Sequence, residues 1–383
     1  MRAINKGLSN ALGLRVVRRR NLEEALFDRD RLRNERDALR TERDELLKQR
    51  DELLGSRAEL LEQRDRLLKE QDLLAHVYLT TLPVLFERPS QRVHLKSGLK
   101  DCIFNSSVVV ARNGGIFAVA RSSTLADYRD GHFAYRGNGV HDTENVWFQL
   151  DSELRLLSER LLDDALLRQQ CPLAAYGIED MRLFDFNGEI YGIGAGISPI
   201  REIGPNALRV TQILVRIEDG AVRQFWTLPS PRGAGHEKNW TPVVRDGKLY
   251  LAYSLMPLVM IEFDQGGMSF SKAAIEGVNL AFALRGGSPF VEYGDKFVSL
   301  AHTPSRSIKN KLFYTHRFVL MNRDFEIVEI SEEFFLRRRG IEFCAGLAPL
   351  GDGFLVSYGI ADQAAAIDRL GLDEIGRFLA GRP

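Results

Sequence analysis

Five β-hairpins of similar design follow one another from about residue 101 onward, and this repeat constrains the fold more than any other feature of the 383-residue chain. Each hairpin joins two apolar runs, rich in Val, Ile, Phe and Tyr, through a tight turn that contains glycine. This is the pattern of paired antiparallel strands. Repeated units of roughly 50–70 residues predict a repeat architecture. The five turns are Asn113-Gly114, Asn187-Gly188, Asp246-Gly247, Gly294-Asp295 and Asp352-Gly353.

A short polar or glycine-rich cluster lies seven or eight residues before each turn. If the first strand of every unit lines a central channel, as in a β-propeller, the clusters converge at one mouth of that channel. A β-sandwich is the alternative fold, but it leaves the constant offset unexplained. We therefore predict an all-β, five-bladed β-propeller. The clusters are Asn105-Ser106-Ser107, Glu179-Asp180-Met181-Arg182, Lys238-Asn239-Trp240, Arg285-Gly286-Gly287-Ser288-Pro289 and Phe343-Cys344-Ala345-Gly346.

Leucine recurs every seven residues without a break from Leu32 to Leu74, a heptad that predicts a long helix. Residues 29–72 hold 12 basic and 13 acidic residues, no proline and one glycine. A second leucine row from Leu47 to Leu68 widens the apolar stripe, whereas arginine stands three residues before the first-row leucines from 32 to 67. We predict an oligomerising α-helical coiled coil about 65 Å long. A single solvated helix held by i,i+4 ion pairs is the alternative.

Residues 1–20 carry six basic residues and no acidic one. They are expected to form a basic tail, and peripheral contact with an anionic membrane surface is the second interpretation. No apolar run approaches the length of a transmembrane helix, and the pattern of a signal peptide is absent. The predicted location is cytoplasmic, with attachment to the inner face of the membrane as the alternative. The predicted parts are a basic tail (1–20), a coiled coil (21–76), a connector (77–100) and the propeller (101–383).

Two further helices are expected in the propeller region. Residues 153–170 read as a helix inserted between the first and second units. Residues 363–379 read as a C-terminal helix that packs on the last blade.

Composition excludes several classes of site. The 52 basic and 52 acidic residues cancel, which argues against binding to nucleic acid. Three distant cysteines, Cys102, Cys171 and Cys344, suit a reducing compartment better than a disulfide framework. The seven histidines are scattered and form no metal-binding motif, and there is no nucleotide-binding glycine loop. We predict no metal and no cofactor.

The predicted mouth gathers several cations and few carboxylates. Glycoside hydrolases generally use two carboxylates at a set separation. Here Asp180 lies in a compact motif, and Glu342 is the other candidate acid. Cations around one acid suit a phosphate nucleophile or leaving group, which Arg and Lys hold while the carboxyl moves a proton. The candidates are Arg121, Asp180, Arg182, Lys238, Asn239, Arg285, His302, Tyr314, Glu342 and Asp362.

Each candidate also has a structural interpretation. Asp180 and Arg182 form an ion pair at the start of a blade in that case, and Lys238 is a surface lysine. His302 is then a hydrogen-bonded strand histidine, and Tyr314 belongs to the packing. Trp240 suits either stacking on a sugar ring or burial in the core.

The string Gly177-Ile178-Glu179-Asp180-Met181-Arg182 resembles the Gly-x-Glu-Asp-Pro-Arg signature of glycoside hydrolase family 130, the β-mannoside phosphorylases and hydrolases. Lys238-Asn239, Gly286-Gly287-Ser288-Pro289 and the terminal Ser357-Tyr358-Gly359-Ile360-Ala361-Asp362 continue the resemblance, which covers about residues 101–370. It implies a five-bladed propeller. Related propellers are mannosyltransferases that use a nucleotide-sugar or sugar-phosphate donor.

The resemblance also implies roles. Asp180 would be the catalytic acid, Asp362 would bind sugar hydroxyls, and Arg121, Arg182 and Lys238 would contact phosphate, with His302 and Tyr314 nearby. Met181 stands where the family has proline, and the strings around Lys238 and Arg285 differ from those of the phosphorylases, which indicates a separate branch. Arg285 adds a cation suited to a diphosphate and favours a transferase.

We therefore predict an enzyme that transfers β-linked, in particular mannosyl, groups. Its partners would be a sugar phosphate or nucleotide sugar and a glycan acceptor, as in polysaccharide biosynthesis. The alternative is a non-catalytic propeller that binds a glycan or a protein on a coiled-coil scaffold. An Asp180 that opens into the mouth beside the cations favours the enzyme, and an Asp180 closed in an ion pair favours the binding module.

Overall fold

The protein is described by a computed structural model that divides into two compact units, Met1–Leu74 and Ala75–Pro383. The described residues are 2–87, 89–129, 132–135, 141–200, 204–233, 235–264, 267–272, 284–306 and 312–381. Among them, no helix combines the length and the apolar character needed to cross a membrane.

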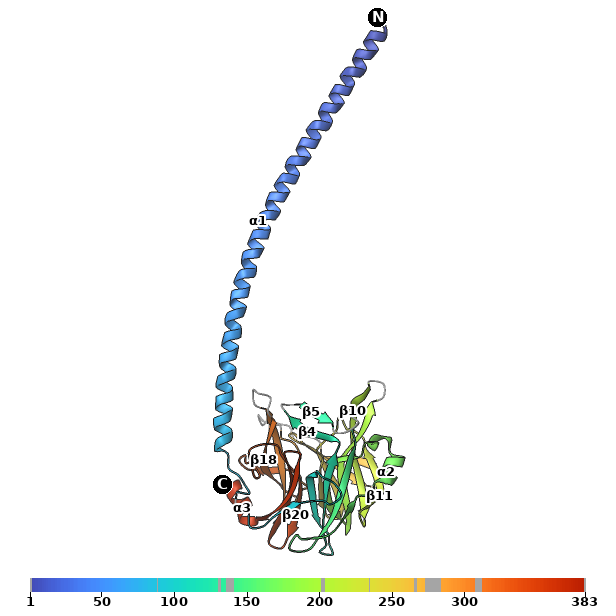
Figure 1. Ribbon diagram of the computed structural model, residues 1–383, viewed down its shortest axis with the longest axis vertical. Helices are drawn as coiled ribbons and strands as arrows, with labels where there is room; N and C mark the ends of the chain where they lie inside the picture. Colours follow the sequence, from blue (N-terminus) through green and yellow to red (C-terminus); the bar gives the residue numbers. More distant parts are fainter. Residues whose placement is uncertain are drawn as a thin grey trace. The chain divides into compact units, whose positions relative to one another are not determined.

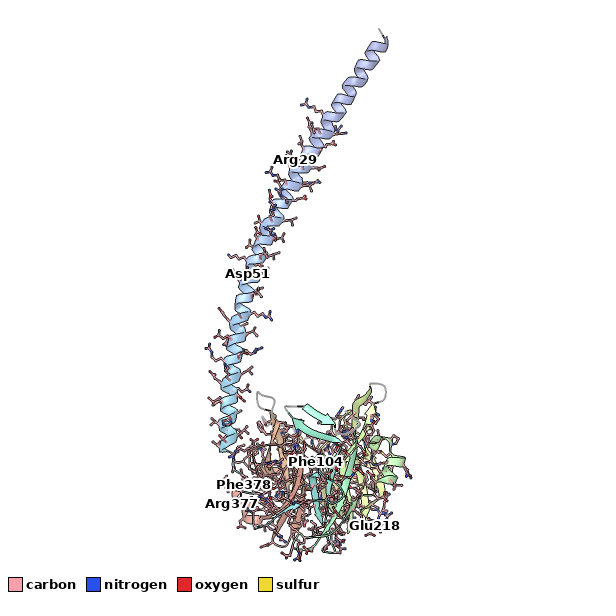
Figure 2. The ribbon with its side chains drawn as sticks, in the orientation of Figure 1. Arg29, Asp51, Phe104, Glu218, Arg377 and Phe378 are labelled. Carbon is pink, nitrogen blue, oxygen red and sulfur yellow. The ribbon has the colours of Figure 1, made fainter. Side chains whose placement is uncertain are left out.

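Helix α1 (Arg2–Thr81) accounts for the first unit and enters the second with its last turns (Figure 1). It therefore includes the residues expected as a tail, and it extends past the predicted end of the coil. Its side chains from residue 19 to 74 project outward and are largely exposed, as Arg29 and Asp51 show in Figure 2. The basic side chains up to Arg18 lie outside the described residues. The prediction of a long N-terminal helix is confirmed, and its pairing into a coil stays a prediction.

The second unit is a five-bladed β-propeller, as predicted, and each blade is a four-stranded antiparallel sheet. Blade 1 holds β2 (Phe104–Val110), β3 (Ile116–Ser123), β6 (Thr143–Leu150) and β7 (Leu156–Leu161), and blade 2 holds β8 (Ile178–Phe186), β9 (Glu189–Ile200), β10 (Gly204–Glu218) and β11 (Ala221–Leu228). Blade 3 holds β12 (Thr241–Arg245), β13 (Lys248–Leu255), β14 (Leu258–Asp264) and β15 (Gly267–Lys272). Blade 4 holds β16 (Val291–Tyr293), β17 (Lys296–Arg306), β18 (Leu312–Met321) and β19 (Ile327–Ile330).

Blade 5 joins the two ends of the propeller. Strands β20 (Glu342–Leu350), β21 (Gly353–Ile360) and β22 (Ala364–Gly371) come from its C-terminal end, and β1 (Arg92–Leu95) adds the outer strand. Arg92 Nε lies 2.9 Å from Asp368 Oδ1 on β22, and the same carboxylate accepts a 2.6 Å hydrogen bond from Tyr358. Strand β1 lies in the segment predicted as a connector. The sequence did not predict this strand, because its four residues are too few to show a strand pattern.

The five predicted turns all connect the first and second strands of a blade. At the second turn, Asn187 and Gly188 have φ values of 56° and 86°, the positive pair that a tight hairpin requires. The first strands of all five blades therefore run in the same sense along the channel. Their beginnings carry the polar clusters to one mouth, and their ends carry mostly apolar residues to the other.

The two helix predictions inside the propeller were wrong for part of their length. Residues 156–161 form β7, and only Ala165–Gln170 forms a helix, α2. Residues 364–371 form β22, and helix α3 covers only Leu372–Leu379. In both segments, strand pairing within a blade overrides local helix propensity. Helix α3 packs through Ile375 and Phe378 on the core shared by blades 4 and 5. A two-stranded hairpin of β4 (Leu125–Arg129) and β5 (His132–Tyr135) extends blade 1.

Candidate active site

The polar mouth is built around Arg121, which β3 places between two carboxylates of β8. Its guanidinium lies 2.8 Å from Glu179 Oε1 and 2.8 Å from Asp180 Oδ1. The Nδ2 atom of Asn105, on β2, donates a 2.9 Å hydrogen bond to the same Asp180 oxygen. Asp362, just after β21, is the third carboxyl. Burial raises its pKa, Arg121 lowers it, and the charges of Asp180 and Glu179 raise it further. Blades 1, 2 and 5 thus contribute to one site.

Several residues at this mouth have left-handed backbone conformations. Asn105, Asp180, Asn239 and Asp362 have φ values of 48°, 51°, 67° and 52°, which residues other than glycine rarely adopt. The pairing of β2 with β3 and of β8 with β9 shifts register at the first two of them. Such bulges redirect side chains, and backbone strain of this kind gathers at functional sites. The bulge at Asp180 turns two successive acidic side chains toward Arg121.

The two neighbouring acids differ in how they are enclosed. Glu179 is 4% exposed, with its carboxylate 2.8 Å from Arg121, 3.1 Å from Lys238 and 3.1 Å from His141. Burial raises the pKa of Glu179, but the charges of Arg121 and Lys238 and the hydrogen bond with His141 outweigh burial and hold the pKa well below its ordinary value. Both hydrogen bonds of the Asp180 side chain go to Oδ1, and this side chain is 18% exposed. Its Oδ2 has no partner among the described residues and is the open oxygen of the site.

Arg182 lies beneath the mouth and ties the blades together. It is 1% exposed, and its guanidinium donates to Asp180 O, to Asn239 Oδ1 and to the carbonyl oxygens of Gly286 and Gly287. Burial lowers the pKa of Arg182 to about 10. These bonds use four of the five guanidinium N–H donors, which leaves at most one for a phosphate contact.

Lys238 and Arg285 are the more accessible cations of the predicted set. The Lys238 side chain is 42% exposed, although its ammonium pairs with Glu179. Arg285 is exposed, and its side chain has no partner among the described residues. Its backbone exchanges two hydrogen bonds with His302, of 2.9 and 3.0 Å. Arg285 therefore stands at the blade 4 side of the mouth, free to contact an anion.

His302 and Tyr314 occupy the wall of blade 4. The ring of His302 is 3% exposed and lies 5.1 Å from the ring of Tyr314 and 5.2 Å from that of Phe343. Burial, and secondarily the nearby cationic groups, hold the pKa of His302 well below its usual value. The imidazole is therefore neutral at neutral pH and offers a hydrogen bond rather than a charge.

Glu342 is not brought to Asp180. It is fully buried, and its two oxygens accept hydrogen bonds from the backbone nitrogens of Arg337 and Arg338, at 2.9 and 3.1 Å. Burial raises its pKa to about 7. The carboxyls near Asp180 are those of Glu179 and Asp362, so a two-acid reaction through Glu342 has no support in this geometry.

Sequence reasoning missed three members of the site and left one residue undecided. Glu179 and Asn105 lay in the predicted clusters, and the charge of Glu179 and the amide of Asn105 could have marked them as candidates. His141 lies outside the repeat pattern, and nothing in the sequence pointed to it. Trp240 is fully buried and donates from Nε1 to Glu237 Oε2 at 3.1 Å, so it belongs to the core.

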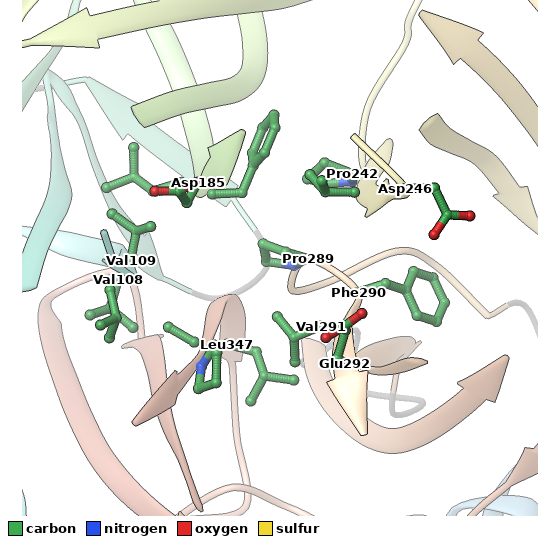
Figure 3. Close-up of a pocket in the computed structure, with 16 residues that line it drawn as sticks. Val108, Val109, Asp185, Pro242, Asp246, Pro289, Phe290, Val291, Glu292 and Leu347 are labelled. Atoms are coloured by element: carbon green, nitrogen blue, oxygen red, sulfur yellow. The ribbon is translucent and has the colours of Figure 1, made fainter. Parts of the chain in front are cut away.

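The other end of the channel is mostly apolar. A cavity of about 310 Å³ lies between the ends of the five first strands, lined by residues such as Val108, Leu183, Pro242, Pro289 and Leu347 (Figure 3). Its lining also includes three carboxylates, those of Asp185, Asp246 and Glu292. Within the described residues, no group of three or more His, Cys, Asp or Glu side chains is arranged to hold a metal ion.

The sequence matches no family model and no curated protein. Solved structures do match. A beta-1,2-mannobiose phosphorylase from Listeria innocua is 14% identical, with 78% of this chain and 97% of that chain covered and a TM-score of 0.53. A GDP-Man-dependent mannosyltransferase from Leishmania mexicana is 12% identical, with 75% and 91% covered and a TM-score of 0.50. At such identities the likeness shows the fold, and it confirms the resemblance to these propellers at that level.

Proposed function

We propose that the propeller transfers a glycosyl group, mannosyl in particular, between a phosphate-bearing donor and a glycan acceptor at the polar mouth. The observation that carries this proposal is the contrast between Glu179 and Asp180. The first acid is closed in ion pairs, and the second keeps Oδ2 open at a mouth that also holds two accessible cations, Lys238 and Arg285. Two of the similar solved structures are named as a mannobiose phosphorylase and a mannosyltransferase, and both names describe reactions of this kind.

Asp180 would move the proton. In the transfer direction, an acceptor hydroxyl gives its proton to Asp180 Oδ2 while its oxygen bonds to the sugar C1, and the bond from C1 to the phosphate oxygen breaks. In phosphorolysis, the carboxyl returns the proton to the glycosidic oxygen as phosphate attacks C1.

The remaining residues divide by accessibility. We assign the phosphate to Lys238 and Arg285, because their side chains are exposed at the mouth. Arg121 holds both acids in place, and Arg182 holds the strand starts together. Asp362, with its raised pKa, would hydrogen-bond sugar hydroxyls, and Tyr314 and His302 would close the wall.

A non-catalytic glycan-binding propeller is the second candidate function. It is favoured by the ion pair between Asp180 Oδ1 and Arg121, which can be purely structural. The setting we propose for either function is cytoplasmic polysaccharide assembly, in keeping with three free cysteines.

A donor screen separates the two. Wild type, Asp180→Asn and the control Asp246→Asn, whose carboxylate is exposed at the other end of the channel, are incubated with sugar 1-phosphates and with nucleotide sugars. Release of phosphate or nucleotide is measured. We expect a loss of at least about 100-fold for Asp180→Asn and none for the control. Glycan binding without turnover, equal in all three proteins, would establish the binding module instead.

A further inference from the structure

Helix α1 carries a row of exposed leucines between residues 19 and 74. The seven first-row leucines are between 57% and 70% exposed. Single exposed leucines are common on protein surfaces, but a long row of exposed leucines on one face of a helix indicates an interaction surface. The members are Leu32, Leu39, Leu46, Leu53, Leu60, Leu67 and Leu74.

The heptad positions around the stripe suggest what covers it. With the leucines at position d, arginine occupies six successive a positions, and the residue before each arginine is at g. In the N-terminal half these g residues are Asp28, Glu35 and Glu42. In a parallel coil, each g residue of one helix lies beside the following a residue of the other. Every seam arginine in this half therefore meets an acid of a second identical helix.

The e positions divide the helix into two unlike halves. They are basic at Arg33 and Arg40 and apolar from Leu47 to Leu68. Parallel, in-register pairing places Arg33 near Asp28 of the other copy, since g and e side chains meet across the seam. It also gathers the extra leucines of both copies in one half. Antiparallel pairing would instead set the basic half against the leucine-rich half.

In the single helix, the seam arginines turn to exposed neighbours. Arg36 and Arg43 lie 2.7 and 2.5 Å from the adjacent Asp37 and Asp44, and all four side chains are more than half exposed. Such contacts are weak and easily exchanged. The guanidinium groups can therefore swing to acids of a partner helix while their stems cover the leucines.

We propose that α1 pairs with α1 of a second copy of this chain, parallel and in register, with Leu32 to Leu74 on the seam. Two propellers are then carried on one coiled coil. The proposal is independent of the reaction at the polar mouth.

Cross-linking of the full-length protein tests the direction of pairing. Leu46→Cys is compared with Lys48→Cys, whose side chain points away from the seam, both in a Cys102→Ser background. We expect oxidation to link most Leu46→Cys chains into dimers and to leave Lys48→Cys chains single. A wild type that sediments as one chain at all concentrations overturns the proposal. So does a dimer in which Leu46→Cys fails to link, or a particle of three or more chains.

Charge reversal tests the pairing across the seam. Glu35→Arg with Glu42→Arg places like charges together, and we expect the dissociation constant of the dimer to rise at least tenfold. Adding Arg36→Glu, Arg40→Glu and Arg43→Glu to the same chain exchanges the signs and is expected to restore the dimer. Helix content, from circular dichroism, identifies any variant that fails by unfolding. A first variant that dimerises as well as wild type contradicts the predicted contacts.

Discussion

Residues 19–74 of α1 and the polar mouth both contain ion pairs between arginine and a carboxylate, but the pairs are exposed on the helix and buried at the mouth. On the helix, Arg43 lies 2.5 Å from Asp44, its neighbour in sequence, and both side chains are more than 60% exposed. At the mouth, Arg121 lies 2.8 Å from Glu179 of another blade, and both side chains are below 10% exposed. Distance alone therefore does not rank these pairs. Exposed pairs contribute little, whereas breaking a buried one leaves an uncompensated charge out of water.

The largest effect is expected from Arg121→Met. The substitution leaves Glu179 and Asp180 without their shared cation, and the loss of one partner from a buried pair costs about 3–5 kcal/mol. Chemical denaturation of the full chain measures the change in the free energy of unfolding. A loss below about 1 kcal/mol would mean that the mouth is as well hydrated as the helix surface, and the comparison would fail.

Glu342 gives a pH-dependent form of the same contrast. Burial raises its pKa from 4.5 to about 7, so the folded protein holds this proton more tightly than the unfolded chain. The stabilisation is complete below the unfolded pKa and is lost as pH rises through about 7. Between pH 4.5 and 8, we expect wild type to lose about 3 kcal/mol more stability than Glu342→Gln. Parallel stability profiles for the two proteins would contradict the assigned burial.

The fold and most members of the site could be predicted from the sequence, but the burial of each side chain could not. Glycine-containing turns are local signals, so five hairpins could be counted directly. Arg121, Asp180 and Asp362 do come together, and their roles stay predictions. The bulges that bury Arg182 and open Asp180 depend on pairing between strands, which spacing along the chain does not reveal. The helix predicted over 153–170 failed because β6 supplies a pairing partner for residues 156–161.

A smaller effect separates the two adjacent acids of the mouth. Glu179→Gln removes a charge held by Arg121, Lys238 and His141, and charged hydrogen bonds of this kind contribute about 1.5–3 kcal/mol. Asp180→Asn keeps an oxygen that can accept from Asn105 and Arg121, so we expect a loss below about 1 kcal/mol. Thermal and chemical unfolding of the pair of variants measures the difference. Equal losses would show that Asp180 is as enclosed as Glu179, which would weaken its assignment as the reacting group.

The smallest effect is expected on α1. Asp44→Asn removes one carboxylate that faces an arginine, as Glu179→Gln does, but here both partners are exposed and adjacent in sequence. The free energy of unfolding, measured from the thermal loss of the helical circular dichroism signal, should change by less than about 1 kcal/mol. Position 44 lies outside the proposed seam, so pairing of two helices leaves it in water. A loss as large as that of Glu179→Gln would mean that this face is also buried, and therefore that more than two helices pack together.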